Sequence, residues 1–324
     1  DIGPILQDTT QTSTLTGTFS GTWTQPETGP YTGETTFALA DSELNEQSIE
    51  SLEASVDLDA DERLAFDLRL RVPGGSTALA GTARPFAERP TLALDDGRIE
   101  ALNIGALLGT SALDTDLNGT LALNGVGQTL RDLSLDGRLN LADSRINEAE
   151  LTEAAWTVNA DAGQLQSTLD AQFDLGTIAA DLEANLPDST YTLSMQADQF
   201  DGAALTGQDT LAADLSELRA TLEGRGWTPE TAEFTTTLDA VDAVYGPFEL
   251  SKATLRAAYG QGRLALDTLQ VDSNVLTATG TGTAALLDVD TPSDVAIDAN
   301  VHDLAPVQEW AGFRVLAADS LYLS

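Results

Sequence analysis

Cysteine is absent from the 324-residue chain, which excludes disulfides, thiolate nucleophiles and cysteine-based zinc or iron–sulfur sites. Histidine and lysine occur once each, as His302 and Lys252. No Gly-Xaa-Ser-Xaa-Gly motif accompanies the histidine, so a Ser-His-Asp triad is not indicated. We interpret His302 as a surface residue near a turn, and we expect a protein that is not an enzyme and needs no cofactor.

Positive charge is scarce. The chain has 15 Lys and Arg against 52 Asp and Glu, a formal net charge of -37. Such a surface does not attract nucleic acid or an anionic membrane face electrostatically, so no nucleic-acid partner is expected. The acidic, lysine-poor composition points to a salt-rich habitat, with a merely solubilising surface as the alternative.

Long hydrophobic runs are also missing. The longest, such as Ile104 to Leu108, fall far short of the roughly 20 residues that cross a bilayer. No basic segment followed by an apolar one begins the chain, so we expect any signal or membrane anchor to lie outside these residues. Linkers rich in Pro, Ser or Gly are absent as well, which predicts one continuous domain over residues 1–324.

Two acidic clusters, at residues 57–62 and 288–290, have the oxygen ligands that calcium prefers. Neither has the spacing of an EF-hand loop, so no metal site is predicted. The glycine pairs at 260 and 262 and at 280 and 282 lack the strand-to-helix setting of a phosphate-binding loop. They are interpreted as turns or strand kinks.

Internal repeats decide the fold class. The phrase that begins at Trp23 recurs almost unchanged at Trp227, and Leu39-Ala40-Asp41-Ser42 recurs at residues 141–144. These spacings predict three units of about 12–112, 113–213 and 214–324. Trp23 and Trp227 are expected to pack at the margin of a sheet, and Trp156 on an apolar face.

Within a unit, apolar and polar residues alternate with the period of a β-strand. The clearest runs cover residues 63–72, 168–175, 190–195 and 294–301. Gly-Gly at 74–75, Asp-Gly at 96–97 and 136–137, and Asn-Gly at 118–119 and 124–125 predict tight hairpin turns. Short helices are expected at residues 102–108 and 306–311, which occupy the same phase of the repeat. The pattern therefore predicts an all-β fold, mostly antiparallel, with a few short helices.

Phrases of the form Leu-Xaa-Gly-Thr-Leu-Xaa-Leu, as at residues 117–123, are followed by a strand-like run at 135–144. Together with Asp303-Leu304-Ala305-Pro306, they resemble the AsmA/TamB family of bacterial envelope proteins. The resemblance covers nearly the whole chain from about residue 12. It lies in the strand-like sequence pattern and in the length of the repeat, and it includes no catalytic motif. It implies a curled, open β-sheet with an apolar groove, in a periplasmic segment of a protein anchored in the inner membrane.

The function that the resemblance implies is the passage of phospholipid acyl chains along the groove between the inner and outer membranes. An outer-membrane assembly protein is a further expected partner, through parts of the parent chain not present in this sequence. Two alternatives stay open: a structural or adhesive β-sandwich module with a closed core, and a chaperone-like factor in outer-membrane protein assembly. The residues expected to line the groove are Phe66, Leu68, Leu70, Leu169, Phe173, Leu175, Leu193, Met195, Leu264, Leu266, Val295 and Ile297.

Overall fold

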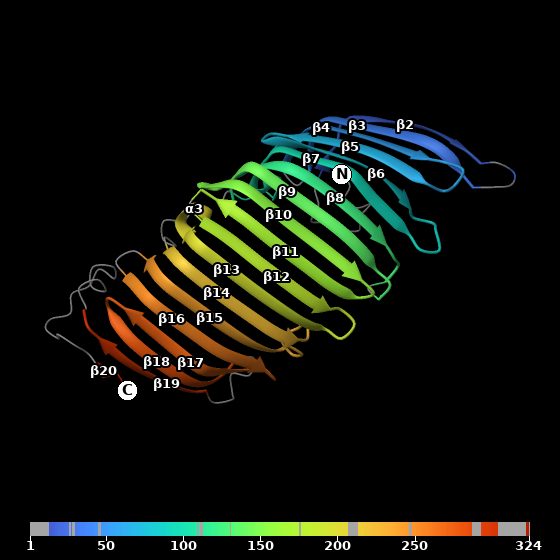
Figure 1. Ribbon diagram of the computed structural model, residues 1–324. Helices are drawn as coiled ribbons and strands as arrows, with labels where there is room; N and C mark the ends of the chain where they lie inside the picture. Colours follow the sequence, from blue (N-terminus) through green and yellow to red (C-terminus); the bar gives the residue numbers. More distant parts are fainter. Residues whose placement is uncertain are drawn as a thin grey trace. The chain divides into compact units, whose positions relative to one another are not determined.

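The fold is shown in Figure 1 as a computed structural model. It describes residues 13–303, apart from 26, 28–29, 45–46, 109, 111–112, 130, 175, 207–212, 246–247 and 287–292, together with residues 322–323. The chain divides into two compact units, Asp1–Gly163 and Gln164–Ser324, and each is described by itself. The boundary lies inside the expected second repeat, and the single domain of three repeats stays a prediction.

The first unit is an antiparallel meander in which consecutive strands pair with each other. The exception is the first edge, where β1 and β2 do not pair with each other. Both pair with the same side of β3, one after the other along its length. The strands are β1 (Ser13–Thr14), β2 (Gly17–Thr24), β3 (Thr32–Leu44), β4 (Gln47–Leu58), β5 (Leu64–Val72), β6 (Gly75–Arg84), β7 (Thr91–Leu102), β8 (Thr115–Val126), β9 (Ser134–Ile146) and β10 (Ala149–Asp161).

The second unit repeats this plan, and each of its described strands pairs antiparallel with the next in sequence. Its strands are β11 (Gln164–Phe173), β12 (Gly176–Asn185), β13 (Thr190–Asp201), β14 (Ala213–Arg225), β15 (Glu233–Tyr245), β16 (Phe248–Gly260), β17 (Arg263–Ser273), β18 (Leu276–Ala285), β19 (Asp294–Val301) and β20 (Tyr322–Leu323). The predicted all-β fold, an open, curled, antiparallel sheet with a few short helices, is confirmed.

Residues with positive φ recur at fixed places in the strands. Asp41, Asp143 and Asp242 have φ values of 47°, 46° and 48°, and each lies near the end of a long strand. Beside two of them, the hydroxyls of Ser42 and Ser144 accept hydrogen bonds from backbone N–H groups 26 residues earlier in the chain, at 2.9 and 2.8 Å. Near Asp143 the pairing of β8 with β9 also shifts register, as at a bulge. A bulge bends its strand and increases the local twist.

The turn predictions were right at one position and wrong at the others. The chain turns at Gly74, where φ is 111°, between β5 and β6. Gly97, Gly119, Gly125 and Gly137 instead lie inside strands β7, β8 and β9. At Gly97, Gly119 and Gly137 a Cβ would come within 2.7 Å of atoms on a paired strand, so these three glycines allow close packing and do not form a turn.

Two short helices occur at the same phase of the repeat, which is the phase at which short helices were expected. α2 (Ile104–Leu108) follows β7, and α3 (Gly202–Thr206) follows β13. The side chains of Asn103 and Asp201 cap them by accepting backbone N–H bonds of 2.9 and 3.0 Å. The helix predicted at residues 306–311 lies outside the described residues. Within the described part of the chain, no helix has the length and hydropathy needed to cross a membrane.

Candidate apolar binding faces

One face of the first unit is apolar, and we call it the inner face of that unit. It carries alternate residues of each strand, and residues paired across strands lie on the same face of a sheet. One row of paired residues crosses the unit from its first edge to its last strand. Its members are Phe19, Phe37, Ala54, Leu68, Leu79, Gly97, Leu121, Leu139 and Trp156.

The second unit has an inner face of the same kind. Met195 pairs with Ala180 and Ala220, and Leu193 pairs with Leu182 and Leu222. The row through Leu193 continues to β19, and no member of it is charged. Its members are Ser167, Leu182, Leu193, Leu222, Thr236, Ala257, Leu266, Gly282 and Val295.

Many large side chains on these faces remain accessible to solvent. On the inner face of the first unit, Phe19 is 71% exposed and Leu92 is 40% exposed. On that of the second, Val295 and Ile297 are 45% and 49% exposed. Among the described residues, the only hydrophobic side chains with 2% exposure or less are Val275 and Leu151. A sandwich would bury its leucines and phenylalanines between two layers, so these exposures identify a single-layered, open sheet.

Glycines allow large side chains to lie flat on the inner face. A Cβ built on Gly33 would come within 2.6 Å of the Trp23 ring, and one built on Gly81 within 2.9 Å of Cζ of Phe66. Each aromatic ring therefore occupies the space that a side chain on the paired strand would need.

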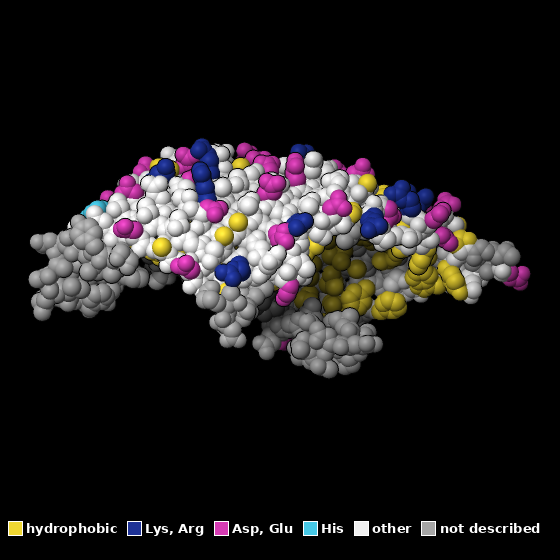
Figure 2. Space-filling model, turned by 90° about the horizontal axis from the view of Figure 1, so that it is seen from below, with side chains coloured by type: hydrophobic (Ala, Val, Ile, Leu, Met, Phe, Trp, Pro, Cys, Tyr) yellow, Lys and Arg dark blue, Asp and Glu magenta, His cyan; other side chains and the backbone are white. Residues whose placement is uncertain are grey.

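Charged groups lie on the opposite face of each sheet, which we call the outer face. On β5, for example, Asp67, Arg69 and Arg71 alternate with the apolar residues. Figure 2 shows hydrophobic side chains gathered in a hollow on the underside of the first unit, with carboxylates and arginines on the upper surface. The ion pairs on this surface are exposed, as between Arg98 and Asp96 at 3.1 Å, and add little stability.

The described members of the predicted groove all lie on an inner face. Phe66, Leu68 and Leu70 project from β5 in the first unit and are half-buried. The others belong to the second unit: Leu169 and Phe173 on β11, Leu193 and Met195 on β13, Leu264 and Leu266 on β17, and Val295 and Ile297 on β19. Leu175 lies outside the described residues. The binding role of the set stays a prediction.

The sequence reasoning missed many members of the same faces. Leu182, Leu222 and Tyr259 pair with predicted residues but were not singled out, and Phe37 lies in the same row as the predicted Leu68. Their strands also place Thr, Ala or Gly at inner positions, which weakens the alternation that identifies a strand. The register of pairing with a clearer strand, as between Leu222 and Leu193, is the signal that reveals them.

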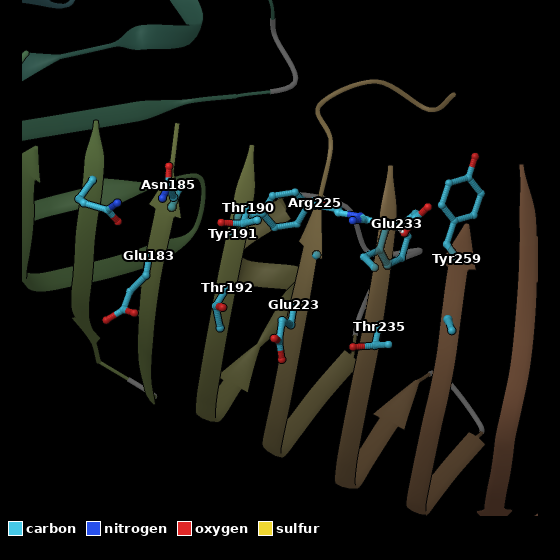
Figure 3. Close-up of a pocket in the computed structure, with 15 residues that line it drawn as sticks. Glu183, Asn185, Thr190, Tyr191, Thr192, Glu223, Arg225, Glu233, Thr235 and Tyr259 are labelled. Atoms are coloured by element: carbon cyan, nitrogen blue, oxygen red, sulfur yellow. Dashed lines mark hydrogen bonds and ion pairs between the residues drawn. The ribbon is translucent and has the colours of Figure 1, made fainter. Parts of the chain in front are cut away.

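A second hollow, on the outer face of the second unit, is polar. Figure 3 shows Glu183, Thr192, Glu223 and Thr235 projecting to the same side from neighbouring strands. At its margin Arg225 donates through Nε to a carboxylate oxygen of Glu233 at 3.0 Å. Carboxylates and threonine hydroxyls alternate across the strands of this hollow, since Glu223 pairs with both Thr192 and Thr235.

Two loops at equivalent places in the repeat hold a carboxylate by hydrogen bonds. After β8, Asp132 accepts backbone N–H bonds from Gln128 and Thr129 at 3.0 and 2.7 Å. Bonding from the Thr129 side chain, followed by these backbone donors, lowers the pKa of Asp132 to about 2. After β14, backbone and Thr228 hydrogen bonds lower the pKa of Glu230. Both carboxylates act as turn caps.

The acidic cluster at residues 57–62 is also a turn. One carboxylate oxygen of Asp59 accepts hydrogen bonds from the backbone N–H groups of Asp61 and Arg63, each at 2.9 Å. Within the residues that the structure describes, no three His, Cys, Asp or Glu side chains converge as a metal site would need. The cluster at 288–290 lies outside those residues.

The tryptophans take different places. Trp156 lies on the inner face opposite Leu139, as expected. Trp23 also lies within a strand on the inner face, and its ring N–H donates to Oγ1 of Thr35 at 3.0 Å. Trp227 instead follows its strand and stacks on Tyr191 with ring centroids 5.2 Å apart. The matching phrases therefore mark one loop of the repeat, but their tryptophans are not structurally equivalent.

Comparison of the chain with family models, with curated proteins and with solved structures found no match.

Proposed function

We propose that each inner face holds the acyl chains of phospholipids, and that the chain is a non-catalytic segment of a bridge between the two membranes of a bacterial envelope. The observation that carries this proposal is the row of paired apolar residues that crosses each open sheet without a covering layer in the described residues. A sheet with one apolar face must bury that face, and here the ligand supplies the missing layer.

The energetics favour hydrocarbon as the ligand. Each methylene group transferred from water to an apolar surface contributes about 0.8 kcal/mol, so a sixteen-carbon chain gains roughly 12 kcal/mol before its ordering cost. The inner rows hold no charged group and few polar ones, so no specific position is preferred. Weak positional preference allows an acyl chain to slide along the face.

The charge distribution supports the same proposal. A phospholipid headgroup is polar and needs water, and the open side of each inner face leaves the headgroup in contact with water. The acidic outer face repels anionic lipids, so the bound lipid is held by its chains and not by its phosphate. This mode of binding does not discriminate strongly between headgroups.

The test is lipid co-purification with face-specific variants. The double variant Leu92→Asp with Ile297→Asp puts one carboxylate on each inner face, at positions exposed enough to tolerate it. Its matched control, Ala93→Asp with Ala296→Asp, adds the same charge at the next residues, which point to the outer faces. Both double variants are expected to fold, as checked by circular dichroism.

Native mass spectrometry and lipid extraction then compare the three proteins. We expect phospholipid on the wild type and on the outer-face control, and at least a five-fold lower lipid content on the inner-face variant. A folded wild type that carries no lipid and takes none from vesicles would overturn the proposal in favour of a structural module. Equal loss in both double variants would show that charge, and not the inner face, controls lipid content.

A further inference from the structure

One margin of the inner face of the second unit is aromatic. Tyr191, Phe234 and Tyr259 belong to one row of paired residues, in which Gly224 lies between the first two. Trp227, in the loop between β14 and β15, stacks on Tyr191 with ring centroids 5.2 Å apart, and Phe234 stacks on Tyr259 at 5.1 Å. Figure 3 shows Tyr191 and Tyr259 near the same end of their strands. We call Tyr191, Trp227, Phe234 and Tyr259 the aromatic margin.

The backbone of the repeat does not require these aromatic side chains. The loops after β8 and β14, at 127–133 and 226–232, are equally long. Each is anchored through its first glycine, whose backbone N–H donates to the carbonyl oxygen of Pro90 at 3.1 Å in the first unit and of Ser189 at 2.7 Å in the second. The first unit forms this backbone without any aromatic residue at the equivalent positions, which are Leu92, Gln128, Leu135 and Ala160.

The aromatic margin also offers polar groups at its surface. The ring N–H of Trp227 and the hydroxyl of Tyr191 make no hydrogen bond within the described residues, and Trp227 is 55% exposed. Tyr259 instead donates to the carbonyl oxygen of Pro229 at 2.8 Å, which holds the loop against the row. Rings of Tyr and Trp are most stable where hydrocarbon meets water, because one end is apolar and the other is a hydrogen-bond donor.

We propose that the aromatic margin binds the glycerol and ester region of a phospholipid and so fixes the direction in which the lipid lies across the second unit. The inference rests on the proposed binding of acyl chains by the inner face. The ester carbonyls accept hydrogen bonds from Trp227 and Tyr191, and the headgroup lies in water beyond them. The chains extend along the strands toward Leu218, which is six residues from Gly224 on β14 and roughly 20 Å away.

The direction of the lipid and its movement are separate properties. An acyl chain slides from strand to strand along the uncharged rows, whereas the aromatic margin determines only which end of the lipid faces the loop between β14 and β15. Direct evidence requires a measurement of which part of the lipid lies beside a given residue.

Nitroxide quenching of fluorescence gives that measurement, with phosphatidylcholine that carries a doxyl group at carbon 5 or at carbon 12 of one chain. The first reporter is Trp227 itself, in a protein with Trp23→Phe, Trp156→Phe and Trp310→Phe. The second is a bimane label on Leu218→Cys, which is unique because the chain has no cysteine. Each protein is loaded from vesicles of the labelled lipid, separated from them by centrifugation, and compared with protein loaded from unlabelled phosphatidylcholine.

We expect the doxyl group at carbon 5 to quench Trp227 at least two-fold more than the group at carbon 12, and the order to be reversed at residue 218. Equal quenching of Trp227 by both lipids, or stronger quenching from carbon 12, would overturn the inference. Quenching at residue 218 alone would also overturn it, but would leave the proposed function intact. No quenching at either reporter, in protein that carries no lipid, would overturn both.

A variant of the margin tests whether the aromatic residues cause the order. Tyr191→Leu with Trp227→Gln supplies the residues that the first unit has at these positions, so the loop is expected to fold, as checked by circular dichroism. With these changes the two lipids should quench the label at residue 218 equally. Thr192→Leu with Thr235→Gln, on the outer face, is the matched control and should keep the preference for carbon 12. An unchanged preference in the margin variant would show that the aromatic margin does not orient the lipid.

Discussion

The bulge at Asp143 is held by a buried serine, and its removal offers a sharp test of how the repeat shapes the sheet. Ser144 is 2% exposed. Its Oγ accepts the backbone N–H of Asn118 at 2.8 Å and is 3.1 Å from the carbonyl oxygen of Ala142. The hydroxyl thus bridges β8 and β9 where the bulge interrupts the ladder.

Ser144→Ala removes this bridge and leaves the Asn118 N–H without its partner in a buried place. An unsatisfied buried donor costs about 1–3 kcal/mol, and the small change in side-chain volume adds little. We expect a loss of about 2 kcal/mol in the free energy of unfolding of the first unit, which is roughly a thirty-fold change in its unfolding equilibrium.

Urea denaturation followed by tryptophan fluorescence measures the loss, since Trp156 lies on the strand that pairs with β9. The midpoint should fall while the slope with urea stays unchanged. Ser134→Ala, on the same strand but exposed, is the matched control and should shift stability by less than about 0.5 kcal/mol. If Ser144→Ala costs no more than this control, the side chain does not hold the bulge.

Three further predictions concern other parts of the first unit. Hydrogen bonds lower the pKa of Asp132 to about 2 from 3.8, so the stability that this carboxylate contributes is present above pH 3.8 and is lost as the pH falls toward 2. An NMR titration of Asp132 should place its midpoint near 2. The variant Asp132→Asn should remove this part of the dependence of stability on acid. Glu34 lies directly opposite Asp57, so Glu34→Thr should raise the melting temperature at low salt, by an amount that shrinks at 1 M salt. Gly81→Val should destabilise by more than 1 kcal/mol in chemical denaturation, because a Cβ there collides with the backbone of Ala93 and the ring of Phe66.

The strands and their facing were predictable because the period-two pattern and strand pairing follow the same geometry. In β5 every second residue is large and apolar, and the pairing with β4 and β6 keeps those residues on one face. Turn positions were less predictable, because an Asn-Gly pair can also lie inside a strand. In β8 the Asn118 side chain accepts the N–H of Ala101 at 2.8 Å and donates to the carbonyl of Asp143 at 3.0 Å. It joins two bulges on neighbouring strands, a long-range role that local sequence does not reveal.

The alternation of apolar and polar residues alone could not distinguish an open groove from a closed core. A sandwich and an open sheet need the same alternation of apolar and polar residues, so Leu68 or Leu193 would look alike in either. What separates them is connectivity: within each unit the described strands from β2 onward pair with their neighbours in sequence, and no described strand returns to cover an inner face.

Charge reinforces this openness. The rows of the inner faces are uncharged, so the repulsion among carboxylates acts almost entirely on the outer faces. Bending a sheet with its charged face outward increases the distance between like charges, as between the directly opposed Glu34 and Asp57, and narrows the apolar side. The acidity of the outer face therefore favours the curl that makes each inner face a trough, and this effect weakens as salt screens the carboxylates.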